Sequence, residues 1–454
     1  MTVPLPERRP APAGPPRRQS RLLASALLAL LAACAAHREV PPPAAAPPSS
    51  TARVLRVGLS GEYPPFSLLR DGQASGFGPE LMETYARARG LTVAWVRFRW
   101  PELSADLAAH RFDVAADGIT VRPERSLIGR YTVPVASNGA VLLLRRPAWA
   151  PATTTPADPL TLLKTLDRPE FRLAVNRGGH LERVARAHFT RAQIIAIPDN
   201  AQVREALARG QADAALTNTV EGPHWAEGLS GIETVGPFTR DVVALFVDAA
   251  NPALAADLDT WLLAQEENGT LGQLRSHGLG PAANTPAARP VEALLDATAE
   301  RLSLMPWVAD IKRRTNQPIE VPAQEARVLE AARADVRKAA AAAGLPAPSD
   351  AAITAFFQAQ IDAAKEIQLR TPPPAAYAPT HSLDGELRPA LTRISARMSA
   401  LVPRVPAGLD PTTVRQIARE HLADAGLSAE TVQRLADALV ALGAPRPIPA
   451  PAAP

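Results

Sequence analysis

The chain has 454 residues, which is too long for one ordinary hydrophobic core, so we expect two or three folded units. Hydrophobic residues make up 46% of it, enough to build such cores. Lys and Arg number 49 against 45 Asp and Glu, and the net charge of +4 is spread along the chain without a basic block. This balance excludes an electrostatic nucleic-acid binder, so no nucleic-acid partner is expected.

The first 34 residues have the pattern of a secretory signal. Arginines precede an apolar run that is too short to span a bilayer comfortably, and small residues close it. The end of that run resembles a bacterial lipobox, in which the signal is cut before the Cys and the thiol is acylated. We therefore expect a signal peptide over residues 1–34, lipidation at Cys34 and a periplasmic, membrane-anchored protein, and Ala35 favours the outer membrane. The alternative is plain cleavage near Ala36 with an incidental Cys.

An α/β unit is predicted over residues 53–280, after a Pro/Ala linker at 35–52. Short β-rich runs alternate there with amphipathic helical stretches, such as 79–90 and 200–211. The runs expected to form strands are 54–60, 91–98, 112–117, 139–146, 172–176, 194–199, 212–218 and 242–248.

An all-α unit is predicted over residues 288–444, after a linker at 281–287 and before a disordered tail at 445–454. The apolar period changes to 3.6 from Val291, and no strand pattern follows. Residues 291–316 have the pattern of one long helix, with Pro306 in its middle. Further helices are expected at 323–344, 349–370, 384–402, 411–425 and 428–442. The expected fold class is therefore multidomain, an α/β domain followed by an all-α helical domain.

The α/β unit resembles the type II periplasmic solute-binding proteins of the amino-acid-binding family, family 3. The motifs that carry the resemblance are "VLRVGLSGEYPPFS", "GFGPELMETYA", "RFDVAADGITVRPERS", "YTVPV" and "ADAALTN". They cover nearly all of residues 53–280 in the family's order. The resemblance implies two α/β lobes with the ligand in the cleft between them, and crossovers near 140–147 and 236–247.

The resemblance also implies which residues bind the ligand. Arg125 matches the arginine that grips a carboxylate, for which a guanidinium fork is suited. Gly179 lies where backbone amides meet an anion at a helix N-terminus. Tyr63 and Trp100 are expected to line the cleft around the ligand, and Thr120 is also expected among the ligand-binding residues. Taken alone, Arg125 could instead be a surface ion pair, and Trp100 could be a core residue.

Two positions depart from the family pattern. His180 stands where relatives often have Thr, and it could cap the helix, donate to the ligand or face solvent. Asn218 stands where the family usually has an Asp that neutralises the ligand's α-amino group. An uncharged amide cannot do this, so the sequence favours a ligand without the amine.

Within this superfamily the unit is most similar to the cyclohexadienyl dehydratases. "RWPEL", "NRGGHLE", "PDNAQV" and "GQADAALTNTVE" have near counterparts there. The family's general acid lies three residues after the Asp/Asn position, which is Glu221 here. A glutamic acid kept neutral by burial could protonate the leaving hydroxyl of prephenate. The alternative for Glu221 is a solvated carboxylate at a helix start.

Residues 288–444 resemble the secreted, all-helical chorismate mutases. The motifs are "LLDATAERLSLMPWVADIKRRTNQPIE", "AFFQAQIDAAKEIQ" and "RISARM". In that family, cations and hydrogen-bond donors hold the compact substrate and stabilise charge on the ether oxygen. The residues implied to do this are Arg301 and Arg397 at carboxylates, Lys312 and Gln368 at the ether oxygen, and Glu325 at the ring hydroxyl. Arg301 and Lys312, eleven residues apart, are expected on one helix face.

The mutase half departs from its family at three positions. Val321 and Gln324 replace an Asp and an Arg that family members often have, and Ala364 replaces a Ser or Thr. The site could be weakened, or rebuilt with Arg313, Arg314 or Arg327. An inactive helical appendage is the alternative.

Together, the two resemblances imply a bifunctional enzyme of phenylalanine biosynthesis. A mutase would convert chorismate to prephenate, and a dehydratase would convert prephenate to phenylpyruvate. Neither resemblance implies a metal or a cofactor, and a homo-oligomer is left open. The competing hypothesis is a solute-binding protein for an amino acid or aromatic acid, serving transport or sensing, fused to a mutase.

Overall fold

The computed structural model describes residues 53–146, 159–280, 283, 285–373 and 381–444. The described residues of both predicted units belong to one compact unit. The expected signal, linker and tail, including Cys34 and Ala35, lie outside the described residues. Among the described helices, none is both long and apolar enough to cross a membrane.

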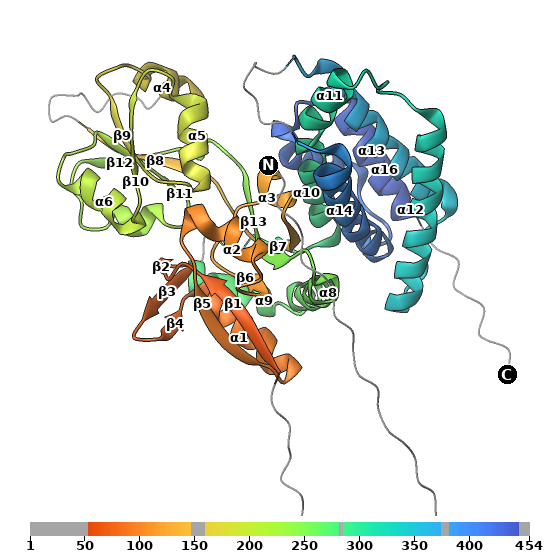
Figure 1. Cartoon of the computed structure of the whole chain (residues 1–454), viewed down its shortest axis with the longest axis horizontal. Helices are drawn as coiled ribbons and strands as arrows, with labels where there is room; N and C mark the ends of the chain where they lie inside the picture. Colours follow the sequence, from red (N-terminus) through yellow and green to blue (C-terminus); the bar gives the residue numbers. More distant parts are fainter. Residues whose placement is uncertain (1–52, 147–158, 281–282, 284, 374–380, 445–454) are drawn as a thin grey trace, which may run out of the picture. The chain divides into compact units, whose positions relative to one another are not determined.

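The first α/β lobe is built on a five-stranded sheet (Figure 1). Its strands are, in sheet order, β5 (Thr92–Arg97), β1 (Val54–Leu59), β6 (Val114–Ala115), β13 (Asp241–Asp248) and β7 (Gly129–Asn138). β1 is parallel to β5 and β6, whereas β13 is antiparallel to β6 and β7. The helices of this lobe are η1 (Trp100–Glu102), α1 (Phe77–Arg89), α2 (Leu103–Ala108), α3 (Pro123–Ser126), α8 (Pro252–Glu267) and α9 (Thr270–Leu279). A small antiparallel sheet holds β2 (Glu62–Tyr63), β3 (Ser67–Arg70) and β4 (Gln73–Ser75).

The second lobe has its own five-stranded sheet. In sheet order its strands are β10 (Gln193–Ile197), β9 (Arg172–Asn176), β11 (Ala214–Asn218), β8 (Ala140–Arg145) and β12 (Ile232–Val235). Its helices are α4 (Pro159–Leu166), α5 (His180–His188), α6 (Asn200–Ala208) and α7 (Gly222–Ala226). β9 and β11 are apolar runs that are buried almost throughout, as expected of central strands covered on both faces.

The chain passes between the lobes twice. It leaves β7 at Asn138 and enters β8 at Ala140, and it returns from β12 to β13 through residues 236–240. The return lies inside the predicted segment. The first passage lies just before the predicted 140–147, because that segment is strand β8 itself.

Each of the predicted strand runs overlaps an observed strand, but several strands were not predicted. The longest is β7, which spans ten residues with Pro134 inside it. A proline argues against a central strand because it cannot donate to the ladder, yet β7 lies at the edge of its sheet, where proline is tolerated. β12 and the small β2–β4 sheet are short and only partly buried, so their apolar alternation is weak.

The second half is entirely helical among its described residues. Its helices are α10 (Pro290–Ser303), α11 (Met305–Arg314), α12 (Pro322–Ala343), α13 (Asp350–Arg370), α14 (Arg388–Leu401), α15 (Pro411–His421) and α16 (Ala429–Leu442), with short turns η3 (Leu383–Leu387), η4 (Val402–Arg404) and η5 (Ala423–Ala425). The single helix predicted over 291–316 is wrong, because the chain breaks at Leu304. Pro306 has no backbone N–H to donate and therefore starts α11 instead of continuing α10.

The joint between the two halves is packed. Arg275 is fully buried and forms an ion pair with Glu266 at 2.6 Å. Glu266 also accepts the backbone N–H groups of Ala287 and Ala288, at 3.1 and 2.9 Å. The predicted linker 281–287 therefore ends in a segment fixed to the α/β half, and one apolar cluster contains side chains of both halves.

Candidate active sites

The first candidate site is a cavity between the two α/β lobes. Asn138 ends β7, Asn176 ends β9 and Asn218 ends β11, and all three line the cavity. In open α/β sheets, ligands bind beyond the carboxyl ends of strands. The cleft residues expected from the sequence all line this cavity, namely Tyr63, Trp100, Thr120, Arg125, Gly179, His180 and Asn218.

Arg125 is the cation of this cavity. Its side chain is buried, and Nη1 donates to the Thr120 carbonyl at 3.2 Å. Its guanidinium lies 5.8 Å from the centre of the Trp100 ring, and burial lowers its pKa. The surface ion pair considered for Arg125 is therefore wrong. Trp100 lines the cavity and also packs edge-on against Tyr63 and Phe98, so it serves both cleft and core.

His180 points into the cleft and is held there by an acid. Its Nε2 lies 3.0 Å from Asp241 Oδ1, while Nδ1 is buried without a partner among the described residues. Asp241 Oδ2 accepts a further hydrogen bond from the Thr239 hydroxyl, at 2.9 Å. His180 therefore does not face solvent, and a polar ring atom is left available to a ligand. The Gly178 amide beside it is already used, because it donates to Glu182 at 2.7 Å.

Asn218 connects the cleft to Glu221. Its Nδ2 donates to the Tyr63 hydroxyl at 2.7 Å. Its Oδ1 accepts the backbone N–H groups of Val220 and Glu221, both at 2.9 Å. This amide therefore fixes both the aromatic wall of the cleft and the turn that carries Glu221.

Glu221 is fully buried rather than a solvated helix-start acid. Asn200 Nδ2 donates to Oε1 at 2.5 Å, and the Thr217 hydroxyl lies 2.6 Å from Oε2. Burial raises the pKa of Glu221 to about 8, and the hydrogen bonds offset this only in part. At neutral pH the group is therefore a carboxylic acid that holds a proton.

Glu221 lies just behind the cavity wall. Asn200 and Asn218 line the cavity, and both bond to the Glu221 residue. The cavity itself measures about 40 Å³, which is room for only a few water molecules. A substrate that contains a six-membered ring therefore requires the lobes to part, and this movement would change what separates Glu221 from the ligand.

The second candidate site lies in the helical half, around Arg301 of α10. Arg301 Nη1 donates to the Gln360 carbonyl of α13 at 3.2 Å. Burial lowers the pKa of Arg301 to about 10, so the guanidinium stays charged at neutral pH. No ion pair joins Arg301 to a carboxylate within the described part of the chain. An interior guanidinium held only by a backbone carbonyl suits an anionic ligand.

Lys312 of α11 and Glu325 of α12 belong to a second charged group in this half. Lys312 Nζ donates to the Ile319 carbonyl at 3.0 Å, and burial lowers its pKa, while Glu325 raises it. Glu325 pairs with Lys365 of α13 at 3.2 Å. Gln368, three residues further along α13, donates weakly to the Met305 sulfur and to the Ala364 carbonyl, and its Oε1 is buried without a partner among the described residues.

Arg397 was expected in the mutase set, but its described contacts lie elsewhere. Its guanidinium pairs with Glu300 and donates to the Tyr131 carbonyl of β7, which belongs to the α/β half. None of its described contacts reaches Arg301, Lys312 or Gln368. Glu300 is next to Arg301 on α10 and therefore points to a different side of that helix. Arg397 pairs with Glu300 and so lies on that side as well.

The three replacement arginines are also engaged elsewhere. Arg313 donates to the Thr371 carbonyl, Arg314 pairs with Asp310, and Arg327 bonds to Gln324. Lys365 is instead the extra cation of the second charged group. Its signal in the sequence is its position, three residues before Gln368 and therefore on nearly the same helix face.

The α/β cleft also contains polar residues that the sequence analysis missed. Asp241, Asn138, Asn176 and Asn200 line the cavity. Two of the amides could have been found, because they end strands, where ligand-binding side chains gather. Asp241 gives no such signal, since its partner His180 is 61 residues away.

Comparison with known proteins supports this division of the chain. Residues 55–280 match the family model "Bacterial extracellular solute-binding proteins, family 3", and residues 292–369 match "Chorismate mutase type II". The chain is 29% identical over 230 residues to a cyclohexadienyl dehydratase of Pseudomonas aeruginosa, which covers 50% of this chain and 82% of that protein. It is 26% identical over 235 residues to a probable amino-acid ABC transporter-binding protein of Haemophilus influenzae, covering 50% and 85%.

A solved structure covers the same half. It is that of the ancestral amino acid-binding protein AncCDT-1, a precursor of cyclohexadienyl dehydratase, with 25% identity, a TM-score of 0.45 and coverage of 50% of this chain and 95% of that one. The family matches confirm the fold class and both resemblances expected from the sequence. The chain joins a family 3 extracellular solute-binding domain to a chorismate mutase type II domain.

Proposed function

We propose that the chain is a bifunctional enzyme that converts chorismate to prephenate and prephenate to phenylpyruvate. The observation that carries the proposal is Glu221, a fully buried acid behind the cleft wall whose pKa is raised to about 8. An acid beside a cleft that burial keeps neutral is suited to donate a proton to a ligand. The mutase domain supplies the compound that such a donor would act on.

The dehydratase step needs one proton and two anion holders. Glu221 protonates the ring hydroxyl of prephenate, and the C–O bond breaks to release water. The bond to the ring carboxylate breaks as CO₂ leaves, and its electron pair completes the aromatic ring. Arg125 and His180 hold carboxylates, and Tyr63, Trp100, Thr120, Gly179 and Asn218 shape the cleft. Glu221 must regain a proton before the next turnover.

The mutase step forms no covalent intermediate. Arg301 holds a carboxylate of chorismate in the compact conformer, and Lys312 with Gln368 stabilises charge on the ether oxygen as the C–O bond breaks. Glu325 orients the ring hydroxyl. Lys365 joins this set because it pairs with Glu325. The departures at Val321, Gln324 and Ala364 contact this set through the backbone. The Ala364 carbonyl accepts from Gln368 Nε2, and the Val321 carbonyl accepts the backbone N–H groups of Gln324 and Glu325.

Two variants test the proposal by separating the half-reactions. Added prephenate should be converted to phenylpyruvate by the wild type and not by Glu221→Gln. Added chorismate should be converted to prephenate by Glu221→Gln and not by Lys312→Ala. If Glu221→Gln turns prephenate over at the wild-type rate, Glu221 is not the acid. If the wild type binds prephenate without turnover, the α/β half is a binding module.

We further propose that Cys34 carries a lipid anchor and that the mature protein is periplasmic, attached to the outer membrane. The support is the lipobox-like end of the signal and the extracellular family to which the α/β half belongs. Cys34→Ser should move the protein from the membrane fraction to the soluble periplasmic fraction. Wild type in the soluble fraction would contradict the anchor. Light scattering of the mature chain tests for a homo-oligomer.

A further inference from the structure

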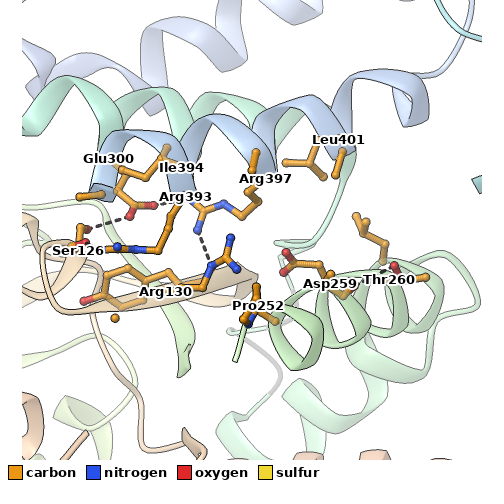
Figure 2. Close-up of a pocket in the computed structure, with 18 of the residues that line it drawn as sticks. Ser126, Arg130, Pro252, Asp259, Thr260, Glu300, Arg393, Ile394, Arg397 and Leu401 are labelled. Atoms are coloured by element: carbon orange, nitrogen blue, oxygen red, sulfur yellow. Dashed lines mark hydrogen bonds and ion pairs between the residues drawn. The ribbon is translucent and has the colours of Figure 1, made fainter. Parts of the chain in front are cut away.

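A second cavity lies where the helical half meets the α/β half (Figure 2). Its walls come from β7 and α8 on one side and from α10 and α14 on the other. It measures about 160 Å³, four times the volume in the α/β cleft. Neither proposed reaction uses it.

Positive charge exceeds negative charge in this cavity. Its lining contains four arginines, Arg130, Arg393, Arg397 and Arg404, and two acids, Asp259 and Glu300. Arg393 and Arg397, one turn apart on α14, reach into the cavity beside Arg130, as Figure 2 shows. If all six groups are charged, two positive charges lack a counter-charge in the lining.

Both acids are already engaged. Glu300 Oε1 accepts the Ser126 hydroxyl at 2.8 Å, and Oε2 pairs with Arg397. Asp259 Oδ1 accepts the Val133 backbone N–H at 2.6 Å. Arg397, Arg130 and Arg404 also act electrostatically on the Asp259 carboxylate, so both acids already face cations of the lining.

The arginines, in contrast, have unused donors. The Nε atoms of Arg393 and Arg397 are buried and have no partner among the described residues. Their Nη groups donate to carbonyls of the α/β half, at Ser126 and Leu127 for Arg393 and at Tyr131 for Arg397. The Arg130 side chain makes no hydrogen bond or ion pair to another described residue. Burial lowers its pKa, and the nearby Asp259 raises it. Buried unpaired donors cost free energy, and an anion that accepts from them would remove this cost.

The remaining lining is apolar and large enough for a ring. Ala255 and Leu263 of α8 face Ile394 and Leu401 of α14 across the cavity. A cavity of about 150 Å³ lined by such side chains accepts a benzene ring. A site with unused cationic donors at one wall and apolar side chains at another fits an acid with an aromatic body.

We propose that this interdomain cavity binds a small aromatic carboxylate that has no ammonium group. The carboxylate meets the Arg130 guanidinium in the positive field of Arg393 and Arg397, and the ring packs against α8. An amino acid fits less well, because its ammonium would meet surplus cations and two engaged acids. Inorganic phosphate fits less well, because it leaves the apolar wall unfilled.

Isothermal titration calorimetry with 3-phenylpropionate tests the site on the full mature chain. The cleft and the mutase site are first disabled with Arg125→Met and Arg301→Met together, and every further variant is made in this background, so that the remaining binding reports the interdomain cavity. We expect one molecule bound per chain. Adding Arg130→Met should weaken binding at least about tenfold, the usual cost of one charge-assisted hydrogen bond. Arg87→Met, the same change at an exposed arginine of α1, should have no effect.

A second variant distinguishes loss of the site from a folding defect. Ala256→Phe fills the mouth of the cavity from the exposed face of α8 and should also abolish binding, while the same change made alone in the wild type leaves the mutase and dehydratase rates without 3-phenylpropionate unchanged. No heat in the background of Arg125→Met and Arg301→Met, or equal affinity with and without Arg130→Met, would overturn the site. Phenylalanine or phosphate binding as tightly as 3-phenylpropionate would overturn its stated chemistry. Because calorimetry needs no turnover, loss of either enzymatic activity leaves this test intact.

Discussion

Glu221→Gln should stabilise the protein at alkaline pH while it removes dehydratase activity. Gln is close in shape to a protonated Glu and can keep both hydrogen bonds. Its Oε1 can accept from Asn200 Nδ2, and its amide can donate to the Thr217 hydroxyl. The variant therefore differs from the folded wild type mainly in that it does not titrate.

The magnitude follows from the pKa of Glu221, which rises from 4.5 in a free side chain to about 8 in the fold. Between these values the folded state holds a proton that the unfolded state has lost. The free energy of unfolding of the wild type therefore falls as pH rises from about 4.5 to 8. At about 1.36 kcal/mol per pKa unit, the loss is under about 1 kcal/mol at pH 5 and about 4 kcal/mol at pH 8.

Urea denaturation of wild type and Glu221→Gln at pH 5 and pH 8 measures this directly. All other titrating groups are shared, so they cancel in the difference between the two proteins. The stability advantage of the variant should grow by about 3 kcal/mol between pH 5 and pH 8. A difference that stays constant over this range would show that Glu221 is not protonated in the folded state, and the general-acid assignment would lose its basis.

Three further substitutions follow from the contacts described above. Arg301→Met should lower the mutase rate by about 10²- to 10³-fold without loss of stability, because no carboxylate is left unpaired; unchanged turnover of chorismate would refute its role. Asn218→Asp should slow prephenate turnover and improve affinity for an amino acid, since it places a carboxylate beside Tyr63. Calorimetry with phenylalanine measures this affinity, and an unchanged value would mean that the Asn218 amide does not select against the amine. Arg275→Met should lower the free energy of unfolding by about 3–5 kcal/mol, because Glu266 would stay buried without its partner; a loss below about 1 kcal/mol in urea denaturation would show that the joint does not depend on this pair.

The sequence predicted the strands of the α/β half well because most are continuous apolar runs with clear limits. It failed at β7, where Pro134 hides an edge strand, and at residues 291–316, where Pro306 divides one apolar period between two helices. The apolar period indicates which residues face a core. It does not indicate where a proline, which has no backbone N–H, ends one helix and begins the next.

The cleft residues were predicted from their order along the chain, and the structure brings them to one cavity. Asp241 and Lys365 were not predicted, because each interacts with a residue that is distant in sequence. Asp241 contacts His180, and Lys365 pairs with Glu325. The contacts of Arg397 could not be predicted for a related reason, because the contact of two fused domains leaves no trace in the sequence pattern of either domain. Its partners, Glu300 and the Tyr131 carbonyl, come from both halves.

The most direct measurement is the fate of chorismate in a single reaction with the full mature chain, followed by NMR. With the wild type, prephenate should appear transiently and phenylpyruvate should accumulate. With Glu221→Gln, chorismate should disappear at the wild-type rate and prephenate should accumulate instead. If the wild type also stops at prephenate, or leaves chorismate unchanged, the chain does not perform the two reactions in sequence and the account is wrong.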